Sequence, residues 1–185
     1  MEDRRTTQNR THSDRDRTIC LSYPAVLYVE GDDNDVVRMR HAWKRVGVLH
    51  PLQVATDGDV ALRYLSGMGP YADRVAHPLP CLALIDLKLA KGSGFDLLKW
   101  IRVVPAIHTL PVVVLSSSSL EVDVHTAYAL GVNGYVEKPP TFDGWRALVA
   151  SVNEFWLTHA ETPPEPRTLF SKPVMGSPEP IRKWM

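Results

Sequence analysis

Three short runs of consecutive apolar residues constrain the fold of this chain more than any other feature of its sequence. The runs are AVLYV at 25–29, CLALI at 81–85 and PVVVL at 111–115. A strand with one exposed face alternates apolar and polar residues, whereas an unbroken apolar run of this length is typical of a strand buried on both faces. Strands of that kind belong to parallel sheets that helices cover on both sides.

The segments between these runs carry apolar residues at helical spacing. In 34–47, the residues Val36, Met39 and Trp43 follow one another at intervals of three and four, and Gly47 is placed to end the helix. The same reasoning predicts further helices over 57–65, 95–103, 122–130 and 141–157, and further strands over 52–55 and 134–137. Five strands therefore alternate with five helices, which predicts an α/β fold with a doubly wound, five-stranded parallel sheet.

The two ends of the chain differ in composition from this central part. Residues 1–22 hold five Arg and four acidic residues and almost nothing apolar, and residues 159–185 hold six of the fifteen prolines. Neither composition favours a packed core, and proline interrupts both helices and central strands. We therefore expect one domain over 23–158, flanked by a flexible N-terminal tail and a proline-rich C-terminal tail.

Charge and composition exclude several classes of protein. The 21 Lys and Arg residues balance 21 Asp and Glu residues, which argues against a nucleic-acid partner bound by bulk charge. No apolar run approaches the roughly 20 residues of a membrane span, and residues 1–18 lack the apolar stretch of a signal peptide. Cys20 and Cys81 lie far apart without a CxxC motif, which argues against a zinc site or a disulfide framework. We expect a cytoplasmic protein without a membrane partner.

Polar residues follow four of the five predicted strands. Glu30 follows the first strand, Asp86 the third, Ser116 the fourth and Lys138 the fifth. Each of them alone would be an ordinary turn residue or helix cap. Because ligands of open parallel sheets bind beyond the carboxyl ends of the strands, the four together predict a site with carboxylates, a hydroxyl and an ammonium group at one edge of the domain.

Four stretches of the sequence identify a family resemblance: VLYVEGDDND at 26–35, LALIDLKLAKGSGFDLLKWIR at 82–102, LPVVVLSSS at 110–118 and GYVEKP at 134–139. Over roughly 24–157 the chain resembles the receiver domains of bacterial two-component response regulators. It is most similar to the single-domain regulators that partner bacterial phytochromes and hybrid histidine kinases, because residues 69–80 look like the insert those proteins carry before the third strand. The resemblance implies the flavodoxin-like strand order 2-1-3-4-5.

The resemblance also implies a role for each polar residue. Asp86 would accept a phosphoryl group from a histidine kinase, Ser116 would bond a phosphoryl oxygen, and Lys138 would pair first with the acceptor and then with the phosphate. Tyr135 would be the aromatic switch residue that moves with the hydroxyl of Ser116. In this family a Lys-Pro bond such as 138–139 is cis. An aspartate can form an acyl phosphate when a divalent cation neutralises the phosphoryl oxygens.

The expected cofactor is Mg²⁺, which prefers oxygen ligands in octahedral geometry. The resemblance implies ligands from Glu30, Asp86 and the main-chain carbonyl of Lys88. Gly31 stands where the family usually has an aspartate that contacts the metal, and the adjacent Asp32 is a candidate substitute. We therefore expect weak Mg²⁺ binding and slow phosphorylation.

Three functional hypotheses follow from these residues. The first is a response regulator of a two-component phosphorelay, and the second is an atypical receiver that binds partners without phosphorylation because Gly31 weakens the Mg²⁺ site. The third is an enzyme on a similar sheet. A haloacid-type phosphatase needs a second acid where this chain has Lys88, and a flavin protein needs a Ser/Thr/Gly-rich loop where it has EGDDND. We therefore predict no enzyme beyond self-phosphorylation and self-dephosphorylation of the acceptor.

The output of the expected switch is protein–protein contact, because the residues after Thr158 are too few and too rich in proline for a DNA-binding domain. The resemblance favours a homodimer, and apolar residues around the fourth and fifth helices suggest where its face would lie. The apolar residues Ala127, Tyr128, Leu130, Trp145 and Trp156 offer a face for it, with the alternative that most of them belong to the core.

Overall fold

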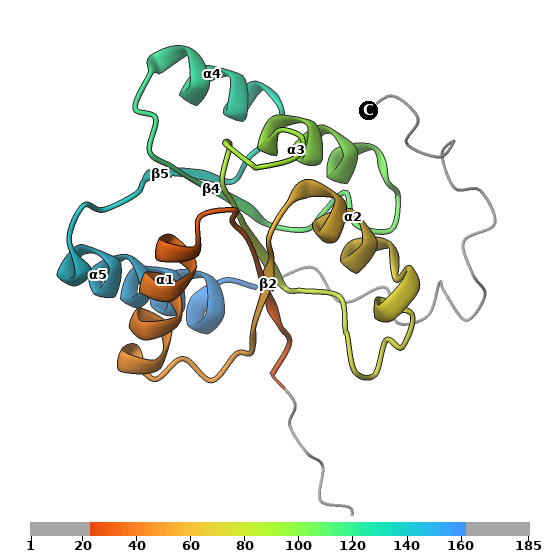
Figure 1. The fold of residues 1–185 in the computed structure, drawn as a ribbon, viewed down its shortest axis with the longest axis horizontal. Coiled ribbons are helices and arrows are strands. Elements are labelled where there is room, and N and C mark those ends of the chain that lie inside the picture. Colours follow the sequence, from red (N-terminus) through yellow and green to blue (C-terminus); the bar gives the residue numbers. More distant parts are fainter. Residues whose placement is uncertain (1–22, 162–185) are drawn as a thin grey trace, which may run out of the picture.

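Strands and helices alternate along residues 23–161, the part of the chain that the computed structural model describes (Figure 1). The strands are β1 (Val26–Val29), β2 (Leu52–Ala55), β3 (Leu82–Ile85), β4 (Val112–Ser116) and β5 (Gly134–Glu137). The helices are α1 (Asp33–Val46), α2 (Gly58–Ser66), the short 3₁₀ helix η1 (Gly69–Tyr71), α3 (Gly94–Val103), α4 (Glu121–Ala129), α5 (Phe142–Val152) and the π-helix η2 (Asn153–His159). The predicted N-terminal tail, and all but the first residues of the predicted C-terminal tail, lie outside the described residues.

All five strands are parallel and lie in one sheet in the order β2-β1-β3-β4-β5. The predicted α/β class, the doubly wound parallel sheet and the strand order 2-1-3-4-5 are all confirmed. β1 lies next to β3, and the chain reverses its direction of winding at that pair. Ligands of open parallel sheets bind at such a reversal point, beyond the carboxyl ends of the strands.

The two faces of the sheet bury alternate residues of each strand. In β1, Val26 and Tyr28 pack with α1 and α5, whereas Leu27 and Val29 pack with α2, α3 and α4. Every residue of β1 and β3 is buried. The apolar runs of the sequence are unbroken because helices cover both faces of the sheet, so that every residue of these strands is buried (Figure 1).

Side-chain caps set where the helices begin. The carboxylate of Asp32 accepts a hydrogen bond from the backbone N–H of Asn34, so that α1 begins at Asp33, one residue before the predicted start. α1 ends at Gly47, whose φ of 76° is in the left-handed region that favours glycine. Thr141 caps α5 in the same way, through the N–H of Gly144.

The last helix differs from its prediction as a single α-helix over 141–157. Its α-helical part ends at Val152, and the chain continues as the π-helix η2. The backbone N–H of Ala160 donates to the carbonyl of Phe155, five residues earlier, at 2.7 Å. That spacing matches the wider turn of a π-helix.

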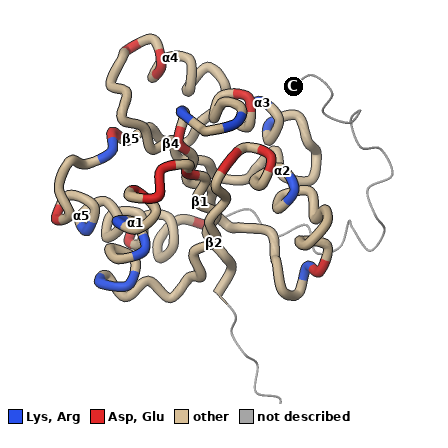
Figure 2. Tube along the Cα trace, viewed as in Figure 1, with Lys and Arg blue, Asp and Glu red and all other residues tan. Residues whose placement is uncertain are grey.

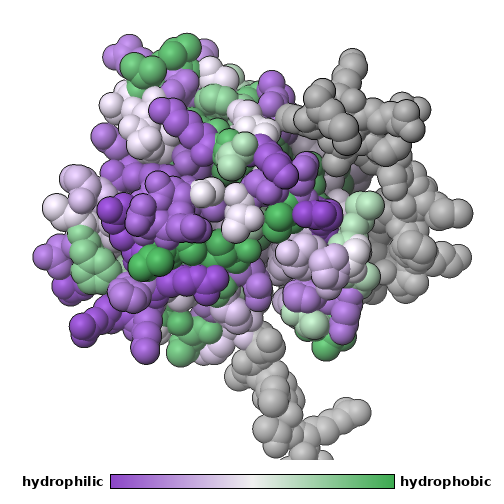
Figure 3. Space-filling view, in the orientation of Figure 1, coloured by the Kyte–Doolittle hydropathy of each residue, from purple (hydrophilic) through white to green (hydrophobic). Residues whose placement is uncertain are grey.

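The surface of the domain mixes polar and apolar residues. Figure 3 shows hydrophobic residues in several small groups, one of them over α4, where Leu120 and Val122 are exposed. Within residues 23–161, no helix combines the length and the apolar character that crossing a bilayer requires.

Candidate functional site

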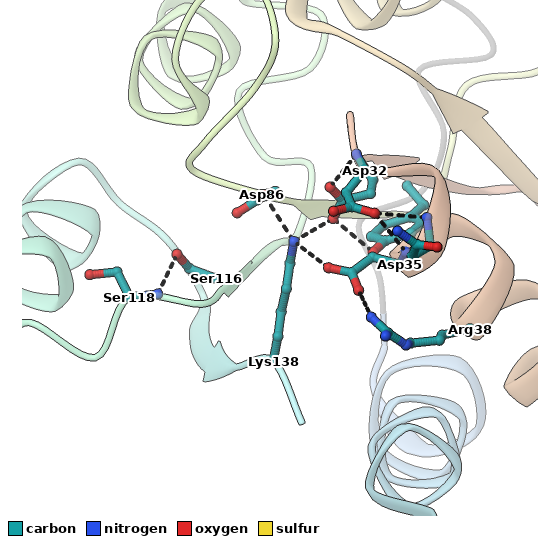
Figure 4. Close-up of polar contacts among 10 residues, drawn as sticks. Asp32, Asp35, Arg38, Asp86, Ser116, Ser118 and Lys138 are labelled. Atoms are coloured by element: carbon teal, nitrogen blue, oxygen red, sulfur yellow. Dashed lines mark hydrogen bonds and ion pairs between the residues drawn. The ribbon is translucent and has the colours of Figure 1, made fainter. Parts of the chain in front are cut away.

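Three of the strands deliver charged side chains to one point at the carboxyl edge of the sheet. Glu30 follows β1, Asp86 follows β3 and Lys138 follows β5. The Lys138 Nζ lies 2.6 Å from Glu30 Oε2 and 2.9 Å from Asp86 Oδ2 (Figure 4). The ammonium group therefore joins two carboxylates that are 56 residues apart in the sequence, and all three side chains are buried.

A third carboxylate reaches the same ammonium group, and sequence reasoning did not single it out. Asp35, in the first turn of α1, places Oδ2 3.0 Å from Lys138 Nζ and Oδ1 2.6 Å from Arg38 Nη1. The acidic stretch after β1 stands out in Figure 2. The position of Asp35 in the first turn of the predicted helix could have identified it from the sequence. A side chain in the first turn of a helix that starts at the sheet edge points back toward that edge.

The electrostatics of the cluster favour a charged Lys138. Burial alone lowers the pKa of this lysine, but hydrogen bonds to Glu30 and Asp86 and the negative charge of Glu30 outweigh burial and raise the pKa above its ordinary value. Tyr28 also donates its hydroxyl hydrogen to Glu30 Oε2 at 2.9 Å. Burial, together with the charge of Glu30, raises the pKa of Tyr28, so that this hydroxyl stays a donor.

Asp86 has one oxygen engaged and one free for a ligand. Its Oδ2 accepts from Lys138, whereas its Oδ1 is buried and has no hydrogen-bond partner among the described residues. A buried carboxylate oxygen without a partner is costly unless a ligand completes it. A hard cation or a phosphoryl group suits an oxygen atom of this kind.

The other predicted metal ligands are arranged less favourably. The carboxylate of Asp32 serves as the N-cap of α1, and its hydrogen bonds to the N–H groups of Asn34 and Asp35 lower its pKa. A Cβ built on Gly31 would lie 3.3 Å from both Ala90 N and Thr56 O. These contacts are close, although the backbone of Gly31 has a φ that other residues also adopt. Within residues 23–161, no three His, Cys, Asp or Glu side chains form a group that could hold a metal ion.

These observations define what a divalent cation would meet here. The free oxygen of Asp86 and the carboxylate of Glu30 are hard donors that suit Mg²⁺ in kind, as is the main-chain carbonyl of Lys88 that the family resemblance predicts as a third ligand. They are few, because Gly31 brings no side chain and Asp32 is engaged in the helix cap.

On the other side of Asp86, the end of β4 places two buried serines. Ser116 Oγ accepts a hydrogen bond from the N–H of Ser118 at 3.1 Å. Ser118 in turn donates its hydroxyl hydrogen to Asp123 Oδ2 at 2.5 Å, and its carbonyl accepts from the hydroxyl of Tyr135 at 2.8 Å. Ser118 thus connects the hydroxyl of Ser116 both to α4 and to β5, a connection that the run of four serines in the sequence did not reveal.

Replacing Ser118 with Ala is expected to loosen the first turn of α4. The variant loses the hydrogen bond to the charged Asp123, and a bond of this kind contributes about 1.5–3 kcal/mol, or at least about a tenfold change in local opening. Amide hydrogen exchange of residues 121–125 should therefore become about tenfold faster or more. Ser119→Ala, which changes an exposed neighbour, is the matched control; equal exchange rates in the two variants would contradict the connecting role of Ser118.

One expectation from the family resemblance needs correction. The Lys138–Pro139 bond is trans, as are all peptide bonds in the described residues. Lys138 still reaches Asp86, because its backbone N–H donates to the carbonyl of Ser116 at 2.9 Å and fixes the residue beside β4.

The burial of the five candidate dimer-face residues decides between the surface and the core for most of them. Ala127 and Trp145 are fully buried in the two hydrophobic cores, so they belong to the interior of the domain. Leu130 and Trp156 are partly buried against those cores, and Tyr128 alone of the five is well exposed. Homodimerisation itself stays a prediction.

The strand order and the polar contacts at the carboxyl edge of the sheet together define a flavodoxin-like α/β domain with a buried carboxylate–lysine cluster beyond its strands. Residues 27–150 match the family described as the response regulator receiver domain, and the chain belongs to that family. Receiver domains are signalling switches of two-component systems and not classical enzymes.

Similar proteins include other response regulators, one of them a cyanobacterial phytochrome response regulator. Response regulator Rcp1 of Synechocystis sp. is 33% identical over 138 residues, which cover 75% of this chain and 92% of that protein. The crystal structure of the phosphorylated cyanobacterial phytochrome response regulator RcpA has a TM-score of 0.71 and 33% identity, covering 76% of this chain and 99% of RcpA. The manganese-bound structure of Rcp1 has a TM-score of 0.69 and 32% identity, with 76% and 99% coverage.

Proposed function

We propose that this receiver domain is a phosphorylation-dependent switch that takes a phosphoryl group from a histidine kinase onto Asp86 and signals through protein contacts. The observation that carries the proposal is the buried, unpartnered Oδ1 of Asp86, next to an Oδ2 that Lys138 holds in place. The similarity to RcpA, whose structure is of the phosphorylated form, supports it. The similarity to phytochrome response regulators favours a phytochrome or a hybrid histidine kinase as the donor.

In the proposed reaction, a carboxylate oxygen of Asp86 attacks the phosphorus of a phosphohistidine. The new bond is P–O, the bond that breaks is P–N, and its electron pair stays on the imidazole nitrogen. Lys138 orients Asp86 before transfer and then neutralises charge on the phosphoryl oxygens, and the hydroxyl of Ser116 donates to one of them. A magnesium ion held by Glu30, Asp86 and the carbonyl of Lys88 would neutralise further negative charge.

The proposed output begins at Ser116. When its hydroxyl turns to a phosphoryl oxygen, the hydrogen bond from the N–H of Ser118 is lost, and Ser118 is bonded to both α4 and the switch residue Tyr135. The new dianionic group would thereby favour a different arrangement of the loop after β4. A cytoplasmic protein whose α4 and β5 surface contacts a partner, or a second copy in a homodimer, fits this output.

A second candidate is a receiver that binds its partner without phosphorylation. The observation that favours it is the small number of metal ligands, since Gly31 offers no side chain and Asp32 caps α1. Weak Mg²⁺ binding follows from either candidate, so that metal affinity alone does not separate them.

Intact mass measurement after incubation with phosphoramidate separates the two candidates. The full chain is expected to gain the mass of one phosphoryl group with Mg²⁺ and none with a chelator. Asp86→Asn, which keeps the size of the side chain but removes the nucleophilic carboxylate, is expected to gain none, an effect of more than 100-fold on initial rate. A wild-type chain that gains no mass at high Mg²⁺ would overturn the switch and leave the phosphorylation-independent binding module.

A further inference from the structure

We infer that Asp35, in the first turn of α1, is a positioning residue for Lys138 and the third carboxylate that contacts its ammonium group. The inference rests on the proposed function for its purpose but not for its geometry. Asp35 Oδ2 lies 3.0 Å from Lys138 Nζ, nearly as close as Asp86 Oδ2 at 2.9 Å.

The local structure orients Asp35 for this contact. Its other oxygen, Oδ1, accepts from Arg38 one turn further along α1 at 2.6 Å, so each oxygen has a cationic partner. The side chain of Asp35 is 14% exposed and that of Lys138 8% exposed, so the pair is shielded from water and from salt. The cap at Asp32 fixes the start of α1 and therefore the direction in which Asp35 points.

The acidic run after β1 thus divides into residues with separate tasks. Glu30 contacts Lys138 and Tyr28, Asp32 caps the helix, and Asp33 lies exposed in the first turn. Asp35 is the member of this run, besides Glu30, that contacts the buried ammonium group. Asp33 therefore matches Asp35 in charge, helix and turn but lacks the contacts of Asp35 with Lys138 and Arg38.

The phosphoryl transfer explains what such a residue contributes. Asp86 changes from a partner of Lys138 into the carrier of the phosphoryl group, so the ammonium must exchange one of its three oxygen partners during the reaction. Glu30 and Asp35, which do not react, hold Lys138 in place from two sides while the third partner changes. A lysine held by Glu30 alone would retain more of the freedom of its four side-chain torsions and would spend less time near the phosphoryl oxygens.

The test compares Asp35→Asn with Asp33→Asn and with the conservative Asp35→Glu in the full chain. The first readout is the ¹⁵N NMR signal of the Lys138 ammonium group, assigned as the signal that Lys138→Arg abolishes. We expect a slowly exchanging signal in the wild type, in Asp33→Asn and in Asp35→Glu, and exchange at least tenfold faster in Asp35→Asn. The second readout is the initial rate of phosphoramidate uptake at saturating Mg²⁺, expected to fall about tenfold in Asp35→Asn alone.

The two readouts test the proposed function and the role of Asp35 separately. If the wild type takes up no phosphoryl group, the proposed function fails, while the ammonium signal still decides the role of Asp35. An unchanged ammonium signal in Asp35→Asn would overturn the inference, as would equal losses in Asp33→Asn. Should Asp35→Asn fail to fold, a loss of the signal in Arg38→Gln, which removes the partner of Asp35 Oδ1, would support the inference, and retention of the signal there would overturn it.

Discussion

Replacing Lys138 with Met is expected to lower the free energy of unfolding by about 3–5 kcal/mol, the range measured when one partner of a buried ion pair is removed. The variant leaves Glu30, Asp35 and Asp86 close together without the cation that now lies 2.6–3.0 Å from each. Buried carboxylates without a counterion repel one another and lose their hydration. Urea denaturation at pH 7 measures the effect.

The pH dependence of this loss distinguishes the cluster from a general packing defect. Because the folded-state pKa of Lys138 is raised, its stabilising contribution is fully present below its unfolded pKa of about 10.4 and disappears as the pH rises through the folded value. The difference between wild type and Lys138→Met should therefore be constant from pH 7 to pH 9 and should narrow only above about pH 10.4.

Lys99→Met is the matched control for this experiment. It removes a lysine whose ion pair with Asp96, at 3.2 Å on the surface of α3, leaves the lysine 57% exposed. Exposed pairs of this kind contribute about 0–1 kcal/mol. Equal losses of stability in the two variants would mean that the carboxylates around Lys138 do not depend on its charge.

Replacing Gly94 with Ala is expected to destabilise the domain by about 1–3 kcal/mol or more and to displace the phosphoacceptor. A Cβ at this position would collide with the carbonyl oxygen of Asp86 and would lie 2.8 Å from the Cα of Leu87. The N–H of Gly94 also donates to the carbonyl of Leu87 at 3.0 Å, so that the start of α3 cannot move away without losing that bond. Both neighbours are backbone atoms and cannot turn aside as a side chain would.

Two measurements check this expectation, the midpoint of urea unfolding and the initial rate of phosphoramidate uptake. Gly134→Ala is the control, because a Cβ on this glycine of β5 meets only ordinary contacts of 3.6 and 3.7 Å with Val113. It is expected to be neutral or slightly stabilising, since alanine loses less conformational entropy than glycine. A Gly94→Ala variant as stable and as active as Gly134→Ala would show that α3 and the Asp86 backbone separate easily.

The sequence alone predicted the architecture because the sheet has a local signature. The three apolar runs required strands buried on both faces of the sheet. The spacing of apolar residues such as Met39 and Trp43 in α1 indicated the face on which each helix packs. The strand order came from the resemblance and not from periodicity, since pairing in a parallel sheet is set by contacts between segments far apart in the chain. Most helix limits were off by about one residue, because a cap such as Asp32 decides them through hydrogen bonds with the backbone, whereas the α-helical part of the last helix ends at Val152, five residues before its predicted end.

The residues that follow the strands were also visible in the sequence, but their partners were not. Glu30, Asp86 and Lys138 stand at strand ends that periodicity locates. The sequence offered Asp32 as the substitute for Gly31, whereas the structure uses Asp32 as a cap and brings Asp35 to Lys138. Which acidic residue reaches Lys138 depends on the angle at which α1 leaves the sheet. In a helix each residue is rotated by about 100° from the one before it, so a change in that angle would bring a different side chain to the lysine. The sequence alone therefore determines which charged residues are available at the strand ends. The direction in which each charged side chain points is decided only by the packing of the helix against the sheet.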